Sequence, residues 1–380
     1  MLDPEQATEP ADIRPVESPS GTVSVIICAY TEKRWDDLGT AIDSMRTQHR
    51  QPDDLVVVID HNDALLARAR AAFGKQARVV PNNRGKGLSG ARNTGIARAA
   101  GDILVFLDDD ARGEPAWLQR LLEPYEDPQV QGVGGSAVPA WPQDARPAWF
   151  PAEFDWVVGC THSGLPTTPA AVRNPVGAAM SFRRSAFELV GGFTEGVGRI
   201  GSRPLGCEET EFGIRLRQAL PSALVIHQPS AVVHHRVSPD RARPGYFWRR
   251  CYAEGLSKAT ITRTVGRESA LSAERDYVRR TLPAATRGYL RTPGRRRAAL
   301  AVITGLVVTT AGYLRGSVHP TSPATGSGRP WSAIATRPCS HAATQPPGHP
   351  ATGSPGRRTT DPANDRSGER QIRRTEKQQC

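Results

Sequence analysis

The sequence is poor in cysteine, in aromatic residues and in apolar N-terminal segments, and each deficit excludes a class of protein. Its six cysteines among 380 residues include no Cys-x-x-Cys pair, which argues against a disulfide framework or a zinc ribbon. The first 22 residues hold five carboxylates and no apolar run, so we expect no secretory signal peptide. Aromatic residues make up 6% of the chain. They do not alternate with basic residues in a repeated pattern of the kind that binds nucleic acid, so we expect no nucleic-acid partner.

Positive charge is confined to the later part of the chain. The formal net charge is +11, yet acidic residues outnumber basic ones before residue 236. Residues 236–297 then carry 16 basic against 5 acidic side chains. A basic stretch after an acidic body suits a phosphate-rich surface, and we expect that surface to be an anionic membrane.

Strand and helix patterns alternate between residues 23 and 235. The β-branched apolar runs predict buried strands at 23–29, 55–59, 78–80 and 103–107. Helical spacing of apolar residues predicts helices at 38–50, 64–73 and 88–100. Strands that alternate with helices form a mostly parallel sheet with helices on both faces, so the predicted fold class is α/β.

The alternation stops in the C-terminal third, where we expect arginine-rich helices at 247–264 and 271–282. Residues 298–314 contain no charge and follow Arg295-Arg-Arg297. They would form about 25 Å of helix, against a hydrocarbon core of about 30 Å, so a membrane span and an interfacial helix both stay open. The predicted division is a disordered N-terminus at 1–21, an α/β domain at 22–245, a basic helical extension at 246–297, a membrane-associated helix at 298–314 and a disordered tail at 315–380.

The α/β segment contains three acidic clusters, at or near predicted strand ends. They are Asp60, Asp108-Asp-Asp110 and Glu208-Glu-Thr-Glu211. Ligands of parallel α/β sheets bind at the carboxyl ends of the strands. Three adjacent aspartates repel one another unless a cation neutralises them, and Mg²⁺ or Mn²⁺ prefers such oxygen ligands. Mg²⁺ also shares its shell with substrate phosphates. The pattern therefore predicts a divalent cation beside a phosphate-bearing substrate.

The ordered series of these segments resembles the family 2 inverting glycosyltransferases of the GT-A fold. The resemblance covers about residues 22–260. It rests on the segments Val23–Glu32, Val57–Asp63, Arg84–Gly95, Phe106–Asp110, Gly191-Gly-Phe193 and Glu208-Glu-Thr-Glu211.

Carried over residue by residue, the resemblance implies a base, a metal site and a nucleotide-sugar site. Glu209 takes the place of the catalytic base, which is usually aspartate in the family. Asp110 and His235 are the implied metal ligands. The implied nucleotide-sugar contacts are Ala29, Glu32, Asp60, Arg84, Gly85, Arg92, Asp108 and Asp109.

A Gly-x-Gly-x-x-Gly match at Gly85–Gly90 offers a dehydrogenase as another interpretation. Pro81-Asn-Asn-Arg84 separates these glycines from the preceding strand, and the unit is the third strand of the chain rather than the first. We therefore favour glycines that let the backbone approach a nucleotide sugar.

The resulting hypothesis is an inverting, metal-dependent glycosyltransferase at the cytoplasmic face of the cell membrane. Its donor would be a nucleotide-diphosphate sugar, and among these we expect a UDP-sugar. Its cofactor would be Mg²⁺ or Mn²⁺. Its acceptor would be a hydroxyl of a polyprenyl-phosphate-linked or other cell-envelope glycan. The alternative is a non-catalytic module that binds a nucleotide sugar or a glycan on the same fold, for which the base Glu209 would be superfluous.

Overall fold

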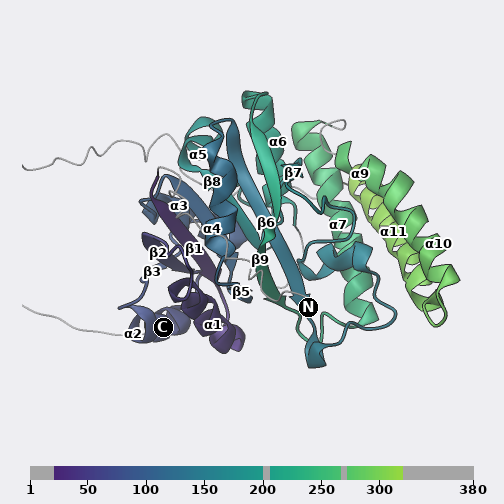
Figure 1. The fold of residues 1–380 in the computed structure, drawn as a ribbon, viewed down its shortest axis with the longest axis horizontal. Coiled ribbons are helices and arrows are strands. Elements are labelled where there is room, and N and C mark those ends of the chain that lie inside the picture. Colours follow the sequence, from purple (N-terminus) through teal and green to yellow (C-terminus); the bar gives the residue numbers. More distant parts are fainter. Residues whose placement is uncertain (1–20, 200–205, 267–271, 320–380) are drawn as a thin grey trace, which may run out of the picture. The chain divides into compact units, whose positions relative to one another are not determined.

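The computed structural model describes residues 21–199, 206–266 and 272–319. Its strands form one nine-stranded sheet in the order β3-β2-β1-β4-β8-β6-β9-β5, and β7 pairs with β9. Helices pack against this sheet, so the predicted α/β class is confirmed (Figure 1). The strands are β1 (Val23–Ala29), β2 (Asp54–Ile59), β3 (Arg78–Pro81), β4 (Ile103–Asp108), β5 (Ala111–Gly113), β6 (Val130–Ala140), β7 (Ala170–Ala171), β8 (Ala179–Arg183) and β9 (Leu224–Arg236).

The first four strands make the parallel half that the sequence predicts. β1 pairs with both β2 and β4 in parallel, and Cys28 stands between Val58 and Asp108 in register. The carboxyl ends of β2 and β4 therefore meet at one edge, which brings Asp60 and Asp108 to the same side of the sheet. The intervening helices are α1 (Trp35–Arg46), α2 (Asp63–Phe73) and α3 (Leu88–Arg98).

Beyond β4 the sheet becomes mixed, which the alternating pattern did not indicate. β8 runs antiparallel to both β4 and β6, whereas β6 and β9 are parallel to each other. The short β5 then folds back antiparallel to β9, with Ala111 opposite His235. This pairing holds His235 beside the aspartates although more than a hundred residues separate them in the chain.

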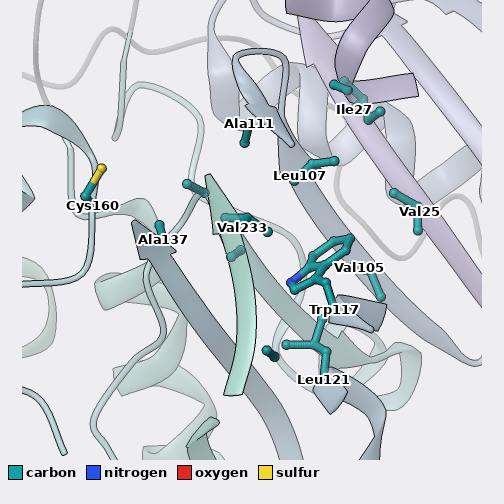
Figure 2. Close-up of a cluster of buried hydrophobic side chains, with 14 of the residues drawn as sticks. Val25, Ile27, Val105, Leu107, Ala111, Trp117, Leu121, Ala137, Cys160 and Val233 are labelled. Atoms are coloured by element: carbon teal, nitrogen blue, oxygen red, sulfur yellow. The ribbon is translucent and has the colours of Figure 1, made fainter. Parts of the chain in front are cut away.

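Alternate strand residues point to opposite faces, and each face has its own hydrophobic cluster. Val25, Ile27 and Val105 pack with α1 and with α4 (Trp117–Leu122) on one face. Figure 2 shows part of this cluster around the buried Trp117. Ile26 and Phe106 face the other side and pack with α3, α5 (Arg184–Val190) and α6 (Glu208–Ala219).

The C-terminal part is helical, as predicted, and it packs against the α/β part. It contains α7 (Pro244–Val265), α9 (Ser272–Asp276), the π-helical turn η5 (Tyr277–Thr281), α10 (Leu282–Arg291) and α11 (Arg296–Val318). Short 3-10 turns complete the described elements at Glu32–Arg34 (η1), Glu123–Glu126 (η2), Pro142–Asp144 (η3) and Ala152–Val158 (η4).

Helix α11 lies directly on α7. A side chain at Gly255 would collide with the backbone of Thr309 and Tyr313, and one at Gly312 would collide with Tyr252. Glycine at these two positions lets the helix backbones approach closely. Gly305 leaves room for the side-chain rings of Phe154 and Phe247.

One predicted segment boundary needs correction, and parts of two predicted segments lie outside the described residues. The apolar helix has 23 residues, so it includes residues 315–318 of the predicted disordered tail. The remainder of that tail beyond residue 319, and residues 1–20 of the predicted N-terminal segment, lie outside the described ranges.

Candidate active site

A cavity of about 800 Å³ opens at the carboxyl ends of β1, β2 and β4. It brings together the acidic clusters that the sequence analysis singled out, which lie far apart in the chain. The cavity is lined by Asp60, Asp108, Asp109, Glu208, Glu209 and His235 among others. Its position at the strand ends is where α/β sheets bind ligands.

Asp108, Asp110 and His235 form the one group of potential metal ligands found in the described residues. One ligand atom from each lies within 4.8 Å of those of the others. His235 Nε2 is 3.1 Å from Asp110 Oδ1 and 3.8 Å from Asp108 Oδ2. Although burial opposes the effect, the neighbouring Asp110 raises the pKa of His235 well above its usual range.

The chemistry of this group fits a divalent cation. Two carboxylates and an imidazole suit Mn²⁺, and the carboxylates alone suit Mg²⁺. The buried Nδ1 of His235 has no hydrogen-bond partner among the described residues, so none of them fixes the orientation of the ring through this atom. Asp108, predicted as a nucleotide-sugar contact, thus lies among the ligand candidates together with Asp110.

Two arginines that the sequence analysis did not assign hold the same aspartates. Arg34 lies 2.6 Å from Asp109 and 3.1 Å from Asp110, and Arg241 lies 3.4 Å from Asp110. Although burial acts in the other direction, His235 and Arg34 hold the pKa of Asp110 well below its usual range. Asp110 therefore stays ionised and available to a cation.

Asp109 has a different environment from its two neighbours. Burial raises its pKa to about 7, despite the opposing effect of Arg34. Its Oδ2 has no hydrogen-bond partner in the described ranges. A buried polar atom in this state is available to a hydrogen-bond donor such as a ribose hydroxyl.

Two of the three glutamates at the start of α6 are held in ion pairs. Glu208 pairs with Arg92 at 2.7 Å, and Glu211 pairs with Arg215 at 2.6 Å one turn along the helix. Glu208 and Glu209 both line the cavity, whereas Glu211 does not. Burial, and next the charge of Glu208, raise the pKa of Glu209 to about 8.

Arg92 links the aspartate motif to α6. Its guanidinium donates to Glu208 at 2.7 Å, to the carbonyl of Gly177 at 3.0 Å and to Asp108 at 3.3 Å. Arg92 was predicted to contact the nucleotide sugar. It lines the cavity, and its hydrogen bonds to Asp108 and Glu208 fix the relative positions of these two carboxylates.

The remaining predicted nucleotide contacts divide into two sets. Ala29 and Asp60 line the cavity, and Asp60 accepts from Asn82 at 2.7 Å and from the backbone of Gly87 at 3.0 Å. Asp60 thereby orders the glycine-containing loop before α3. Glu32 is exposed on η1, and neither it nor Arg84 or Gly85 lines the cavity.

Arg84 and Gly85 instead contact Glu195. Arg84 lies 3.7 Å from that carboxylate, and the backbone of Gly85 donates to it at 3.1 Å. The loop is therefore tied to a segment that lies beyond α5. Sequence reasoning placed this loop near a nucleotide sugar but had no signal for Glu195 as its partner.

Comparison with known proteins gives relatives over most of the described chain. Residues 24–191 match the family described as Glycosyl transferase family 2. The chain is 34% identical over 242 residues to the glucosyl-dolichyl phosphate glucuronosyltransferase of Haloferax volcanii, which covers 63% of this chain and 77% of the relative. It is 31% identical over 178 residues to the pre-mycofactocin glycosyltransferase of Mycobacterium tuberculosis, covering 45% of this chain and 37% of that protein.

One solved structure similar to this chain is a mannosyltransferase from Pyrobaculum calidifontis in complex with GDP-Man and Mn²⁺. The two are 18% identical with a TM-score of 0.48, and the match covers 79% of this chain and 90% of the other.

Proposed function

The chain belongs to glycosyl transferase family 2, and from this premise we propose that it transfers a sugar, with inversion, from a nucleotide-diphosphate donor to an acceptor hydroxyl. The observation that carries the proposal is the placement of Glu209 in the same cavity as Asp108 and His235, which form a potential metal site together with Asp110. Inverting transfer needs one base for the acceptor and one means of stabilising the departing diphosphate.

Glu209 is the base in this proposal. It takes the proton of the acceptor hydroxyl as that oxygen bonds to the anomeric carbon, while the bond from this carbon to the diphosphate oxygen breaks and its electron pair leaves with the diphosphate. A raised pKa makes Glu209 a stronger base than an ordinary carboxylate. The ion pair between Arg92 and Glu208 holds the start of α6 in place, which keeps Glu209 directed into the cavity.

Asp108, Asp110 and His235 would hold Mg²⁺ or Mn²⁺. The cation would offset the negative charge that develops on the diphosphate. Arg34 pairs with Asp109 and Arg241 pairs with Asp110. In this proposal Oδ2 of Asp109 accepts a hydrogen bond from a hydroxyl of the nucleotide sugar.

Product stereochemistry tests the proposed mechanism. We expect a sugar released from an α-linked nucleotide donor in the presence of Mn²⁺ to appear first as the β-anomer, because a single displacement inverts the anomeric carbon. Proton NMR during the first minutes, before mutarotation, distinguishes the anomers. An α-anomer formed first would require a double displacement and would refute the single-base mechanism.

The acceptor and the location are part of the same proposal. The Haloferax volcanii relative is named for a lipid-linked acceptor, glucosyl-dolichyl phosphate, which supports a lipid-linked or cell-envelope glycan acceptor here. We place the protein at the cytoplasmic face of a membrane and take a UDP-sugar as the first donor to test.

Helix α11 supplies the surface for membrane contact. Among the described residues it alone is long and apolar enough to cross a membrane, but a third of its most apolar stretch is buried in the protein. Its exposed face carries an apolar stripe, which consists of Leu300, Ile303, Val307, Leu314 and Val318. Exposed arginines at 291, 296 and 297 lie at its start, a combination typical of a helix that lies in the interface of an anionic membrane.

Replacing Leu300, Val307 and Leu314 together by serine should abolish membrane binding without unfolding the protein, because all three side chains are exposed. Flotation with vesicles of equal parts phosphatidylglycerol and phosphatidylcholine measures the binding. Leu189→Ser, on the exposed surface of α5, is the control. Undiminished flotation of the triple variant, or equal binding to pure phosphatidylcholine vesicles, would refute the anionic-interface assignment.

A further inference from the structure

The cavity continues past Glu209 into a part that the proposed chemistry does not use. This part lies between the α/β domain and the C-terminal helices, and α7, η5, α10 and α11 all contribute to its wall. Four apolar or aromatic side chains of this wall are here called the apolar arm: Val278, Leu282, Leu306 and Tyr313. Apolar side chains of this kind accommodate hydrocarbon.

Three of the arginines that line the same cavity are here called the arginine group: Arg199, Arg241 and Arg250. Arg241 and Arg250 have carboxylate partners in Asp110 and Glu254. Arg199 has no ion-pair partner within the described ranges. Burial, and next the positive charges of Arg241 and Arg250, lower its pKa.

The same local excess of positive charge affects the nearby Tyr246. Although burial acts against it, Arg241 and Arg199 lower the pKa of its phenol. Like charges brought together in a cavity are relieved by an anion, and a guanidinium offers paired N–H donors that match a phosphate.

The arginine group and the apolar arm are joined by direct contacts. The guanidinium of Arg250 lies 5.7 Å from the centroid of the Trp156 ring. Trp156 Nε1 donates to the hydroxyl of Tyr277 at 3.2 Å, and Tyr277 adjoins Val278 at the entrance of the arm. One molecule can therefore extend from the arginines into the arm.

We propose that the arginine group and the apolar arm together bind an acceptor in which a phosphate is joined to a hydrocarbon chain. Arg199 and Arg250 contact the phosphate, and Val278 and Leu306 contact the chain. The inference rests on the proposed function and gives the acceptor of that reaction its chemical class. It also explains why the C-terminal helices form part of the cavity wall instead of only covering the sheet.

Decyl phosphate, kept below its micellar concentration, is the probe. We expect calorimetry with the full-length protein in EDTA to detect its binding, and decanol and butyl phosphate to bind at least about 10-fold more weakly, because each lacks one half of the ligand. Arg199→Gln and Val278→Glu should each weaken decyl phosphate binding about 10-fold or more. Leu290→Glu is the matched control for Val278→Glu, since both residues are exposed apolar positions, on α10 and on the adjoining η5, and only Val278 lines the cavity.

Two results would overturn the inference while leaving the proposed transfer intact. If Arg199→Gln weakened Mn²⁺-dependent binding of UDP or GDP but not of decyl phosphate, the arginine group would serve the donor diphosphate. If Val278→Glu and Leu290→Glu bound decyl phosphate equally well, the arm would not hold the chain. Hydrolysis of the nucleotide sugar by the same variants reports separately on the transfer chemistry.

Discussion

Glu209→Gln is expected to lower turnover by about 10²–10⁴-fold, which is the usual contribution of a general base. Glutamine keeps the shape of the side chain and removes the group that accepts the proton. Donor and metal affinity should change little, because Glu209 is not among the potential metal ligands. Initial rates at saturating donor, with calorimetry of donor binding alongside, separate the two effects.

Glu211→Gln is the matched control, since Glu211 lies on the same helical turn but pairs with Arg215. It should reduce stability and leave turnover of the folded protein nearly unchanged. Equal losses of turnover in both variants would show that the base is not Glu209.

The pH dependence of kcat/KM should also identify Glu209 as the base. A base acts only when it is deprotonated, so a pKa of about 8 for Glu209 predicts that kcat/KM is full above pH 8 and falls as the pH drops below it. This acidic limb should be absent from the residual activity of Glu209→Gln. A limb that persists unchanged in the variant belongs to another group.

Asp110→Asn is expected to weaken Mn²⁺-dependent nucleotide binding by about 10²-fold or more and to reduce turnover as well. Even partners that only support metal ligands contribute about 10–100-fold to affinity, and Asp110 has its carboxylate directed at His235 at 3.1 Å. Calorimetry with UDP and with GDP, each in the presence of Mn²⁺, measures the effect.

Loss of folding must be separated from loss of metal in this variant. Asp110 is buried and contacts both Arg34 and Arg241, and removing one partner of a buried ion pair costs about 3–5 kcal/mol. Thermal unfolding of the variant, together with His235→Gln, controls for this. Normal Mn²⁺-dependent binding by a folded Asp110→Asn protein would remove Asp110 from the metal site.

The parallel half of the fold could be predicted from sequence because its signals are local. Each strand from β1 to β4 is a short apolar run, and each helix between them has apolar residues at helical spacing. Since parallel strands end at one edge, the positions of Asp60 and Asp108 followed from the same pattern. The different directions of Glu208, Glu209 and Glu211 also follow from a local pattern, since adjacent residues of a helix do not point to the same side.

The partners of these carboxylates could not be predicted, because they come from distant parts of the chain. Arg34 reaches Asp109 across 75 positions, and Arg92 reaches Glu208 across 116. Arginines occur throughout the sequence, and no local pattern distinguishes those that enter the cavity. The resemblance implied Glu32 as a nucleotide contact, yet Arg34 is the residue of that turn that lines the cavity.

The C-terminal helices were predicted as elements but not as part of the cavity wall. Composition indicated an apolar helix with arginines before it, and it could not show that Gly255 and Gly312 allow α11 to lie on α7. This close packing brings Leu306 and Tyr313 to the cavity. It also means that removal of α11 would expose Phe154 and Phe247, so point substitutions on its outer face are the appropriate probes of membrane binding.

The most direct test of the central claim, a metal-dependent transfer site with Glu209 as its base, is hydrolysis of UDP- and GDP-sugars by the wild-type protein. Release of free sugar is measured with Mn²⁺ and with EDTA, and Glu209→Gln is assayed in parallel. We predict that at least one donor is hydrolysed with Mn²⁺, and that its hydrolysis is lost in EDTA and in the variant. Hydrolysis that persists in EDTA or in Glu209→Gln, or donor binding without hydrolysis of any sugar, would contradict it.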